Sequence, residues 1–236
     1  MSEMERKNFI YSTQFSDKLN HSKSHASCST GCMSFILPAV HSAHIMNHGL
    51  FESELISWSK QLIDSSKCFI DVGAHSGTYS IFLSQFVTTV HAFEPQKMSF
   101  YALCGSICLS GRANIDAHPF ALGSVEQVGT SNLYINSIDG GSSSLFQHAD
   151  TIEVETIEVR TLDSFKIGNV GFIKIDAESN EVNVIKGGLM TLEESYWPKI
   201  LFESNQYVPE LWDLLKNLGY RIIGINGYKN MFLAEK

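Results

Sequence analysis

The sequence predicts an α/β protein built on a mostly parallel sheet with helices on both faces. Short apolar segments alternate with segments of helical periodicity along most of residues 51–236, which is the pattern of doubly wound sheets. The first apolar segment ends in a glycine-rich loop that precedes a helix, at a position where such sheets often bind ligands. A β-rich stretch near residues 121–160 interrupts the alternation.

Hydrophobic periodicity and turn residues predict the elements in the first half of this alternation. Leu55, Trp58 and Leu62 recur at helical spacing and predict an amphipathic helix before the first strand. The apolar runs that follow are short and bounded by turn residues, as buried parallel strands are. The predicted elements are a helix at 51–63, a strand at 68–72, a helix at 78–86, a strand at 89–93, a helix at 96–109 and a strand at 114–119.

The second half begins with the β-rich insert. Its two β-rich stretches, 132–136 and 152–160, flank the glycine- and serine-rich residues 139–144, which form either a hairpin connection or a mobile lid. The alternation then resumes. The predicted elements are a strand at 171–176, a helix at 181–194, a strand at 199–203, a helix at 209–218 and a closing antiparallel pair at 220–225 and 231–234.

Residues 1–34 are polar and show little hydrophobic periodicity, which is typical of a partly ordered extension. We therefore place the folded domain in residues 35–236. His21, His25, Cys28 and Cys32 lie within twelve residues of one another, and such side chains can bind zinc. The compressed spacing favours a flexible polar tail over a zinc site.

Composition limits the kinds of partner, and the cellular compartment, that we expect for the protein. The chain has 17 basic and 25 acidic residues, a formal net charge of -8, and no run of Lys or Arg, so nucleic acid is not an expected partner. The five cysteines indicate free thiols in a reducing compartment, because Cys68, Cys104 and Cys108 sit in apolar segments. No signal peptide and no run of ~18 apolar residues is evident. We expect a soluble cytoplasmic protein without membrane contact.

The residues from Asp71 to Gly77 lie where a predicted strand hands over to a helix. Gly73 and Gly77 allow a tight turn and a close approach to a ligand, and the helix that follows offers free N–H groups. The spacing is D-x-G-x-x-x-G and not G-x-G-x-x-G, which disfavours a dinucleotide site. A plain structural turn is the alternative.

Glu94 ends the next predicted strand, about twenty residues after the glycines. An acidic side chain at that position can accept both hydroxyls of a ribose. Glu94 alone could be an ordinary turn residue, but together with the glycine loop it favours an adenosine-containing cofactor.

Lys174, Asp176 and Glu178 lie at the end of a predicted central strand. Charged groups near a core are costly unless they have a role, so they are candidates for contacting the cofactor or the substrate. A salt-bridged structural cluster is the alternative.

These segments together resemble the FkbM family of S-adenosylmethionine-dependent O-methyltransferases over roughly two thirds of the chain. Both the content of the segments and their order along the chain are similar to the family. The matching segments are Phe69-Ile-Asp-Val-Gly-Ala-His-Ser-Gly-Thr-Tyr-Ser80, Ala92-Phe-Glu-Pro95, Ala121-Leu-Gly123, Ser143-Ser-Leu145, Thr161-Leu-Asp-Ser164 and Ile173-Lys-Ile-Asp-Ala-Glu178.

The resemblance implies a seven-stranded, Rossmann-like class I methyltransferase fold with S-adenosylmethionine as cofactor. It implies that residues of the first segment surround the methionine part, that Glu94 and Pro95 lie at the ribose, and that Asp176 faces the reaction centre. The cofactor-binding residues expected on this basis are Asp71, Gly73, Ala74, His75, Gly77, Thr78, Tyr79, Ser80, Glu94, Pro95, Phe120, Ala121, Leu122 and Asp176, with the residues from Phe120 to Leu122 near the adenine.

Two departures from the family pattern stand out. His75 occupies a position where the family usually has Asn, and both side chains can hydrogen-bond. Ser179 and Asn180 replace the usual glycine after the Asp-x-Glu motif, which alters the turn beside the expected substrate.

A hydroxyl acceptor must lose its proton as it is methylated, so a base is expected. The candidate catalytic residues are Asp176, Glu178, His148 and Glu203. The carboxylates among them could alternatively collect a divalent cation such as Mg²⁺ or Mn²⁺. The sequence does not decide between a side-chain base and a metal.

The expected reaction is methylation of a hydroxyl on a sugar, a glycan or a small natural product. One alternative is 2′-O-methylation of RNA ribose, which would need a basic groove. The other is a cofactor-binding partner subunit that has lost catalysis, which the altered segment after Asp176 would permit. Neither the acceptor nor the oligomeric state can be read from the sequence.

Overall fold

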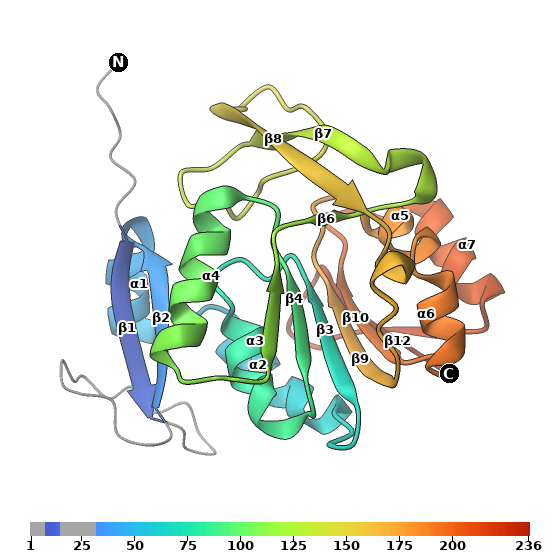
Figure 1. Cartoon of the computed structure of the whole chain (residues 1–236), viewed down its shortest axis with the longest axis horizontal. Coiled ribbons are helices and arrows are strands. Elements are labelled where there is room, and N and C mark those ends of the chain that lie inside the picture. Colours follow the sequence, from blue (N-terminus) through green and yellow to red (C-terminus); the bar gives the residue numbers. More distant parts are fainter. Residues whose placement is uncertain (1–7, 15–31) are drawn as a thin grey trace.

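The computed structural model describes residues 8–14 and 32–236. Its centre is a seven-stranded sheet in the order β11-β12-β10-β9-β3-β4-β5 (Figure 1). β12 pairs antiparallel with both of its neighbours, and every other pairing is parallel. The strands are β3 Cys68–Val72, β4 Val90–Phe93, β5 Ile115–His118, β9 Val170–Ile175, β10 Lys199–Glu203, β11 Arg221–Gly224 and β12 Met231–Glu235. This confirms the predicted α/β fold.

Helices cover both faces of this sheet because its central strands are apolar on both sides. Successive residues of a strand point to opposite faces, and Phe69 and Ile70 accordingly join two different core clusters. One face carries α1 Ser42–His48, α2 Ser53–Ser59, α3 Thr78–Leu83 and α4 Lys97–Leu109. The other carries α5 Glu181–Lys186, α6 Leu189–Glu194 and α7 Pro209–Asn217.

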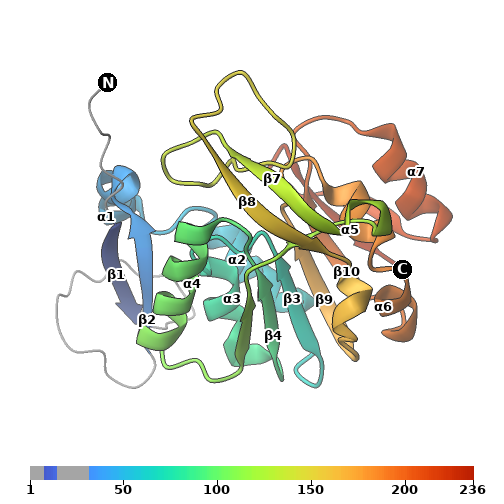
Figure 2. The same ribbon diagram turned by 45° about the horizontal axis from the view of Figure 1, so that its top comes forward.

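The β-rich insert forms a separate three-stranded sheet of β6 Ala121–Leu122, β7 Gly129–Ile135 and β8 Glu153–Arg160. β7 pairs antiparallel with β8, and β6 pairs parallel with it. Figures 1 and 2 show this sheet over one end of the central sheet. Its own small core contains Ala121, Leu133, Ile157 and Val159. The insert therefore covers this end of the central sheet.

The N-terminal region departs from the expected polar extension. β1 Asn8–Gln14 pairs antiparallel with β2 Cys32–Pro38, so β2 runs across the expected boundary at residue 34. Met33, Phe35 and Leu37 alternate along β2 and are buried. Their period-two pattern contains only three apolar residues, which is why the periodicity of the sequence did not predict it.

β2 lies against α4, and two serines of that helix region fix it there. Ser106 Oγ lies 2.8 Å from the backbone nitrogen of Ile36 and accepts its hydrogen bond. Ser110 Oγ accepts from the Ser34 nitrogen at 2.9 Å and donates to the Ser34 carbonyl oxygen at 2.9 Å. The hairpin thus extends the packing of the domain on the α4 side.

The cysteines differ partly from the expected set of free thiols. Cys68, Cys104 and Cys108 are free, but only Cys68 is buried. Cys32 is disulfide-bonded, so the expectation of free thiols does not hold for it. His21, His25 and Cys28 of the candidate zinc motif lie outside the described residues. No helix in the described residues is long and apolar enough to cross a membrane.

The predicted helix at 181–194 is two helices, α5 and α6, that meet at Gly187 and Gly188. Gly187 lies against the main chain of Gly123, and a Cβ on Gly187 would come within 2.0 Å of the Gly123 carbonyl oxygen. The helical break therefore lets the C-terminal layer pack directly against the start of the insert.

Candidate cofactor and acceptor site

A cavity of about 260 Å³ lies at the carboxyl ends of β3, β4 and β9, beneath the insert. Strand ends, the first glycine loop, the residues just before α2 and the insert all contribute to its wall. The residues that line it are His41, Phe51, Glu52, Val72, Gly73, Ala74, His75, Thr78, Tyr79, Phe93, Glu94, Pro95, Phe120, Ala121, Leu122, Leu133, Asp139, Gly140, Gly141, Ser143, Leu145, Lys174, Asp176, Ala177, Glu178 and Asn180.

The glycine loop after β3 forms the floor of this cavity. Gly73 adopts a positive φ of 73°, and a Cβ there would meet the Asp176 carbonyl oxygen at 1.9 Å. His75 also has a positive φ, of 49°, which is unusual for a residue with a side chain. The loop is therefore a constrained turn pressed against the end of β9.

Glu94 is 6% exposed and holds this turn from the neighbouring strand end. Its Oε2 accepts the backbone N–H of His75 at 2.8 Å, and its Oε1 accepts that of Gln96 at 2.8 Å. Burial raises the pKa of Glu94, and the charge of His75 and these backbone donors offset only part of that rise. Each oxygen keeps a second lone pair, so the carboxylate can accept further hydrogen bonds from a ligand.

Lys174 lies among carboxylates at the end of β9. Its Nζ donates to Asp176 Oδ2 at 3.0 Å and to the Gly73 carbonyl oxygen at 3.2 Å. Burial alone would lower the pKa of Lys174, but the charges of Asp176 and Asp71 outweigh it and raise the pKa. Lys174 is therefore a charged group that ties the glycine loop to Asp176.

Tyr79 lies between Lys174 and Glu52, the residue that precedes α2. Its hydroxyl donates to Glu52 Oε2 at 3.0 Å, and Lys174 Nζ lies 5.3 Å from the centre of its ring. Burial, and after it the charge of Glu52, raises the pKa of Tyr79, so this hydroxyl stays protonated. Glu52 thereby reaches the same cavity as Asp176 from a different element.

Glu178 and Glu203 are two further carboxylates, and each is close enough to Asp176 to feel its charge. Burial and then the charges of Asp176 and Glu203 raise the pKa of Glu178 to about 8. Burial and then the charge of Asp176 raise the pKa of Glu203 to about 7, and Asn230 donates a hydrogen bond to Glu203. Glu203 lines a smaller adjoining cavity of about 100 Å³, which shares Asp176 and Glu178 with the first. Carboxyl groups that titrate near neutral pH can serve as general bases.

The turn after Asp176 forms without the glycine of the family pattern. Glu178 and Ser179 adopt positive φ angles of 48° and 79°. Glu181 Oε1 accepts the backbone N–H groups of Ala177 and Ser179, each at 3.2 Å. Asn180 Nδ2 donates to the Leu122 carbonyl oxygen at 3.0 Å, which joins this turn to the insert. Side-chain hydrogen bonds thus compensate for the unfavourable backbone angles.

A loop of the insert closes one side of the cavity. Asp139 Oδ2 lies 2.5 Å from His41 Nε2, and the Asp139 carbonyl oxygen lies 2.9 Å from His75 Nε2. Burial would raise the pKa of Asp139, but hydrogen bonds from Ser137 and His41 lower it to about 2. Ser144 Oγ donates to the Glu178 carbonyl oxygen at 2.9 Å. The glycine- and serine-rich segment therefore lies over the cavity in a closed arrangement.

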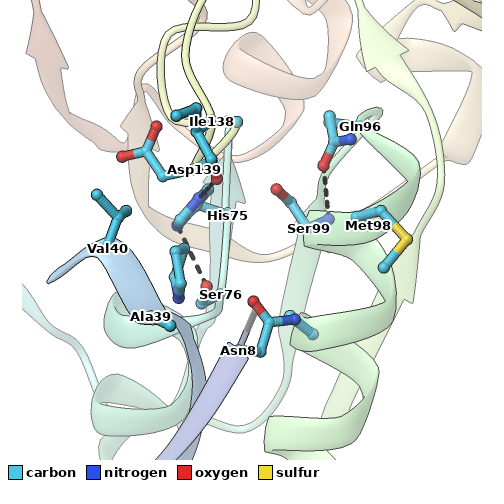
Figure 3. Close-up of a pocket in the computed structure, with 13 residues that line it drawn as sticks. Asn8, Ala39, Val40, His75, Ser76, Gln96, Met98, Ser99, Ile138 and Asp139 are labelled. Carbon is cyan, nitrogen blue, oxygen red and sulfur yellow. Dashed lines mark hydrogen bonds between the residues drawn. The ribbon is translucent and has the colours of Figure 1, made fainter. Parts of the chain in front are cut away.

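Figure 3 shows the other side of this closure, where a second cavity of about 250 Å³ adjoins the first. His75 and Asp139 line both cavities, and His75 Nδ1 lies 3.2 Å from Ser76 Oγ. Gln96 caps α4 by accepting the Ser99 backbone N–H at 2.6 Å.

Most of the expected site residues line the first cavity, and a few lie elsewhere. Asp71 and Ser80 are buried behind the glycine loop, where Ser80 Oγ donates to Asp71 Oδ2 at 2.6 Å. Gly77 is the N-cap of α3 and does not line the cavity. His148 is exposed and lines neither of these cavities. The expected residues that do line it are Gly73, Ala74, His75, Thr78, Tyr79, Glu94, Pro95, Phe120, Ala121, Leu122, Asp176 and Glu178.

Sequence reasoning missed His41, Glu52 and Asp139. His41 and Glu52 belong to the segment before β3, where periodicity revealed a helix but not which residues face the sheet ends. Asp139 lies in the loop that the sequence marked as a lid, without indicating which residue would hold it closed.

The placement of the carboxylates in the described part of the chain bears on the divalent cation considered from the sequence. Within residues 8–14 and 32–236, no group of three or more His, Cys, Asp or Glu residues is arranged to hold a metal ion. The divalent cation considered from the sequence therefore has no support in the placement of Asp176, Glu178 and Glu203.

Comparison with known families identifies the family to which the chain belongs. Residues 71–222 match the methyltransferase FkbM domain, which is more than half of the chain. The chain belongs to the FkbM methyltransferase family. A comparison with curated proteins finds no match.

Solved structures of low sequence identity share the fold of this FkbM domain. A methyltransferase FkbM from Methylobacillus flagellatus KT is 18% identical, with a TM-score of 0.51, and the alignment covers 73% of this chain. The chain spans 44% of the length of that relative. A precorrin-6y C5,15-methyltransferase from Geobacter metallireducens GS-15 is 12% identical, with a TM-score of 0.51, and the alignment covers 79% of this chain and 91% of the other.

An FkbM domain uses S-adenosylmethionine as methyl donor, and the cavity fits that cofactor. Glu94 retains free lone pairs on a buried carboxylate, which suits the hydroxyls of a ribose. Phe120 offers a half-buried ring, 4.0 Å from the Arg160 guanidinium, at the expected adenine end. Carboxylates outnumber amines in the lining, which suits a cofactor that carries a sulfonium and an ammonium.

Proposed function

We propose that this FkbM protein is an O-methyltransferase that methylates a hydroxyl of a sugar, a glycan or a small natural product. The observation that carries the proposal is the set of carboxylates beyond Asp176. Glu178 and Glu203 have pKa values raised to about 8 and about 7, and both line the smaller cavity that adjoins the first. Such groups can take the proton that a hydroxyl loses on methylation.

Each residue has a distinct part in this proposal. S-adenosylmethionine, when bound, supplies a methyl group on a positively charged sulfur. Glu94 would hold the ribose, and Lys174 and Asp176 would position the methionine end. Glu178 or Glu203 accepts the proton of the acceptor hydroxyl. The loop around Asp139 excludes water and holds the acceptor in place.

The proposal is tested by incubating the protein with methyl-labelled S-adenosylmethionine and a panel of hexosides and polyhydroxylated natural products. We expect an O-methyl product by mass spectrometry and NMR. Asp176→Ala should abolish turnover with an unchanged circular dichroism spectrum, whereas Glu193→Ala, at an exposed position on α6, should behave as wild type.

Two outcomes would contradict the proposal. One is a methyl group on nitrogen or carbon, and the other is unchanged turnover in Asp176→Ala. A structured RNA in the same panel tests the ribose-methylating alternative. A parallel series with EDTA tests whether a divalent cation takes part, and activity that survives EDTA would favour a carboxylate base.

A further inference from the structure

Phe51 is a large aromatic side chain that lines the cavity at the ends of β3, β4 and β9 and is 46% exposed. In the part of the chain that the structure describes, it belongs to none of the three hydrophobic clusters. A single exposed aromatic ring on an open surface needs no explanation. A ring in the wall of a ligand cavity, however, offers apolar area that a bound ligand can cover.

Two histidines of the preceding segment hold the Phe51 ring in place. His44 stacks on it with 4.3 Å between the ring centroids and an interplanar angle of 4°. His41 meets it in a T-shaped arrangement with 5.0 Å between the centroids, and His41 in turn contacts Asp139 of the insert loop. The ring is therefore positioned before a ligand binds, so that little side-chain entropy is lost on binding.

Glu52 brings a carboxylate into the same cavity from the next position in the chain. Its φ of 53° lies in the left-handed region, which is uncommon for a residue with a side chain. Its Oε2 accepts the Tyr79 hydroxyl at 3.0 Å, and a carboxylate has further acceptor positions that a ligand can use. Unfavourable backbone angles cluster where ligands are bound, so the turn formed by Phe51 and Glu52 is a candidate binding element.

This turn is close to the groups proposed to act on the acceptor. Burial, then the charge of Asp176 and then that of Glu52 raise the pKa of Glu203, one of the two proposed bases. The ring of Tyr79, whose hydroxyl Glu52 accepts, lies 5.3 Å from Lys174 Nζ. Lys174 Nζ itself contacts Asp176 at 3.0 Å. The turn that carries Glu52 therefore lies beside the carboxylates proposed to receive the proton of the acceptor.

An exposed ring next to a carboxylate matches the chemistry of a sugar. One face of a pyranose ring presents C–H groups, whose small positive partial charges suit the negative face of an aromatic ring. Its hydroxyls are O–H donors, which suit a carboxylate. We infer that Phe51 and Glu52 bind the acceptor, with the Phe51 ring against the C–H face of a pyranoside and Glu52 accepting one of its hydroxyls. This inference rests on the proposed function, because it concerns the acceptor of that same reaction.

The experiment measures the binding of a panel of methyl hexopyranosides to protein saturated with S-adenosylhomocysteine, by NMR titration. For the hexoside that binds wild type most tightly, Phe51→Ala should weaken binding by about tenfold. Phe51→Trp should restore it, because tryptophan keeps an aromatic face. Glu52→Gln should weaken binding severalfold, because it keeps an acceptor for Tyr79 but loses the stronger hydrogen bond of a charged group.

The affinity for S-adenosylhomocysteine, measured by isothermal titration, separates acceptor binding from cofactor binding. Its Kd should stay within about twofold of wild type in Phe51→Ala and Phe51→Trp. Phe146→Ala and Glu54→Gln are the matched controls and should bind the hexoside as wild type does. Phe146 is 45% exposed, Glu54 is an exposed residue of α2, and neither lines the cavities at Asp176.

Three results would overturn the inference. They are unchanged hexoside binding in Phe51→Ala, an equal loss of affinity for S-adenosylhomocysteine in that variant, and no binding of any hexoside to wild type. Hexoside binding that depends on Phe51, without methyl transfer, would support the inference and contradict only the proposed function. Methyl transfer to a sugar whose binding Phe51→Ala leaves unchanged would contradict only the inference.

Discussion

At the scale of single residues, the site depends on charged groups whose behaviour is set by burial. Lys174 remains charged because Asp176 and Asp71 face it, and Glu178 keeps its proton to higher pH because Asp176 and Glu203 are close. The sequence identified Asp176, Glu178 and Glu203 as candidates from their places at strand ends. It could not identify Glu52, since its contact with Tyr79 depends on how α2 packs against α3.

The first prediction concerns the pH dependence of methyl transfer. A base with a raised pKa holds its proton at low pH, so kcat should rise with pH through the region of about 7 to about 8 where Glu203 and Glu178 lose theirs. Glu178→Gln should lower kcat by about a hundredfold if Glu178 is the base. The measurement is a kcat profile from about pH 6 to about pH 9 for wild type, Glu178→Gln and Glu203→Gln. A flat wild-type profile, or unchanged rates in both variants, would rule out the carboxylate base.

At the scale of elements, function depends on how the insert meets the central sheet. The sequence predicted the β-rich insert and its glycine- and serine-rich loop, because turn residues and β-rich stretches are local signals. It could not predict that the loop closes over the cavity, since the contacts from Asp139 to His41 and His75 join residues far apart in the chain.

The second prediction concerns this loop. Asp139→Ala removes the contact with His41 and should loosen the loop, so the Kd for S-adenosylmethionine should rise by about five- to tenfold. Hydrogen exchange in residues 137–144 should become faster at the same time. Asp150→Ala, in an exposed position of the same insert, is the control. Equal affinity and equal exchange in Asp139→Ala and wild type would show that the contact does not hold the loop.

The third prediction concerns the break between α5 and α6. Gly187→Ala would place a Cβ 2.0 Å from the Gly123 carbonyl oxygen, so the main chains must move apart. We expect a loss of about 1–3 kcal/mol in the free energy of unfolding, measured by urea denaturation. Gly168→Ala is the control, because a Cβ there meets nothing within 4 Å. A midpoint for Gly187→Ala equal to that of the control would contradict the close packing.

At the scale of the whole molecule, most of the central sheet could be predicted because its buried strands are short, mostly apolar runs bounded by turn residues. The β1–β2 hairpin could not, because the alternation in β2 is short and β1 has only one short apolar run, Phe9-Ile-Tyr11. The prediction of a single helix at 181–194 was wrong for a different reason. Its periodicity continues across Gly187 and Gly188, and only the packing against the insert shows why the helix breaks there.

The proposed reaction requires that the cavity at the carboxyl ends of β3, β4 and β9 binds the cofactor. Glu94 is the residue on which we base the test, since it supports the glycine loop and also lines the cavity. Loss of the carboxylate would remove the partner expected for the ribose.

The most direct test is isothermal titration of S-adenosylmethionine and S-adenosylhomocysteine into wild type, Glu94→Ala and the surface control Glu193→Ala. We expect micromolar binding to wild type and to the control, and at least about tenfold weaker binding to Glu94→Ala with the fold intact by circular dichroism. No binding to wild type, or equal binding to Glu94→Ala, would contradict the assignment of this cavity.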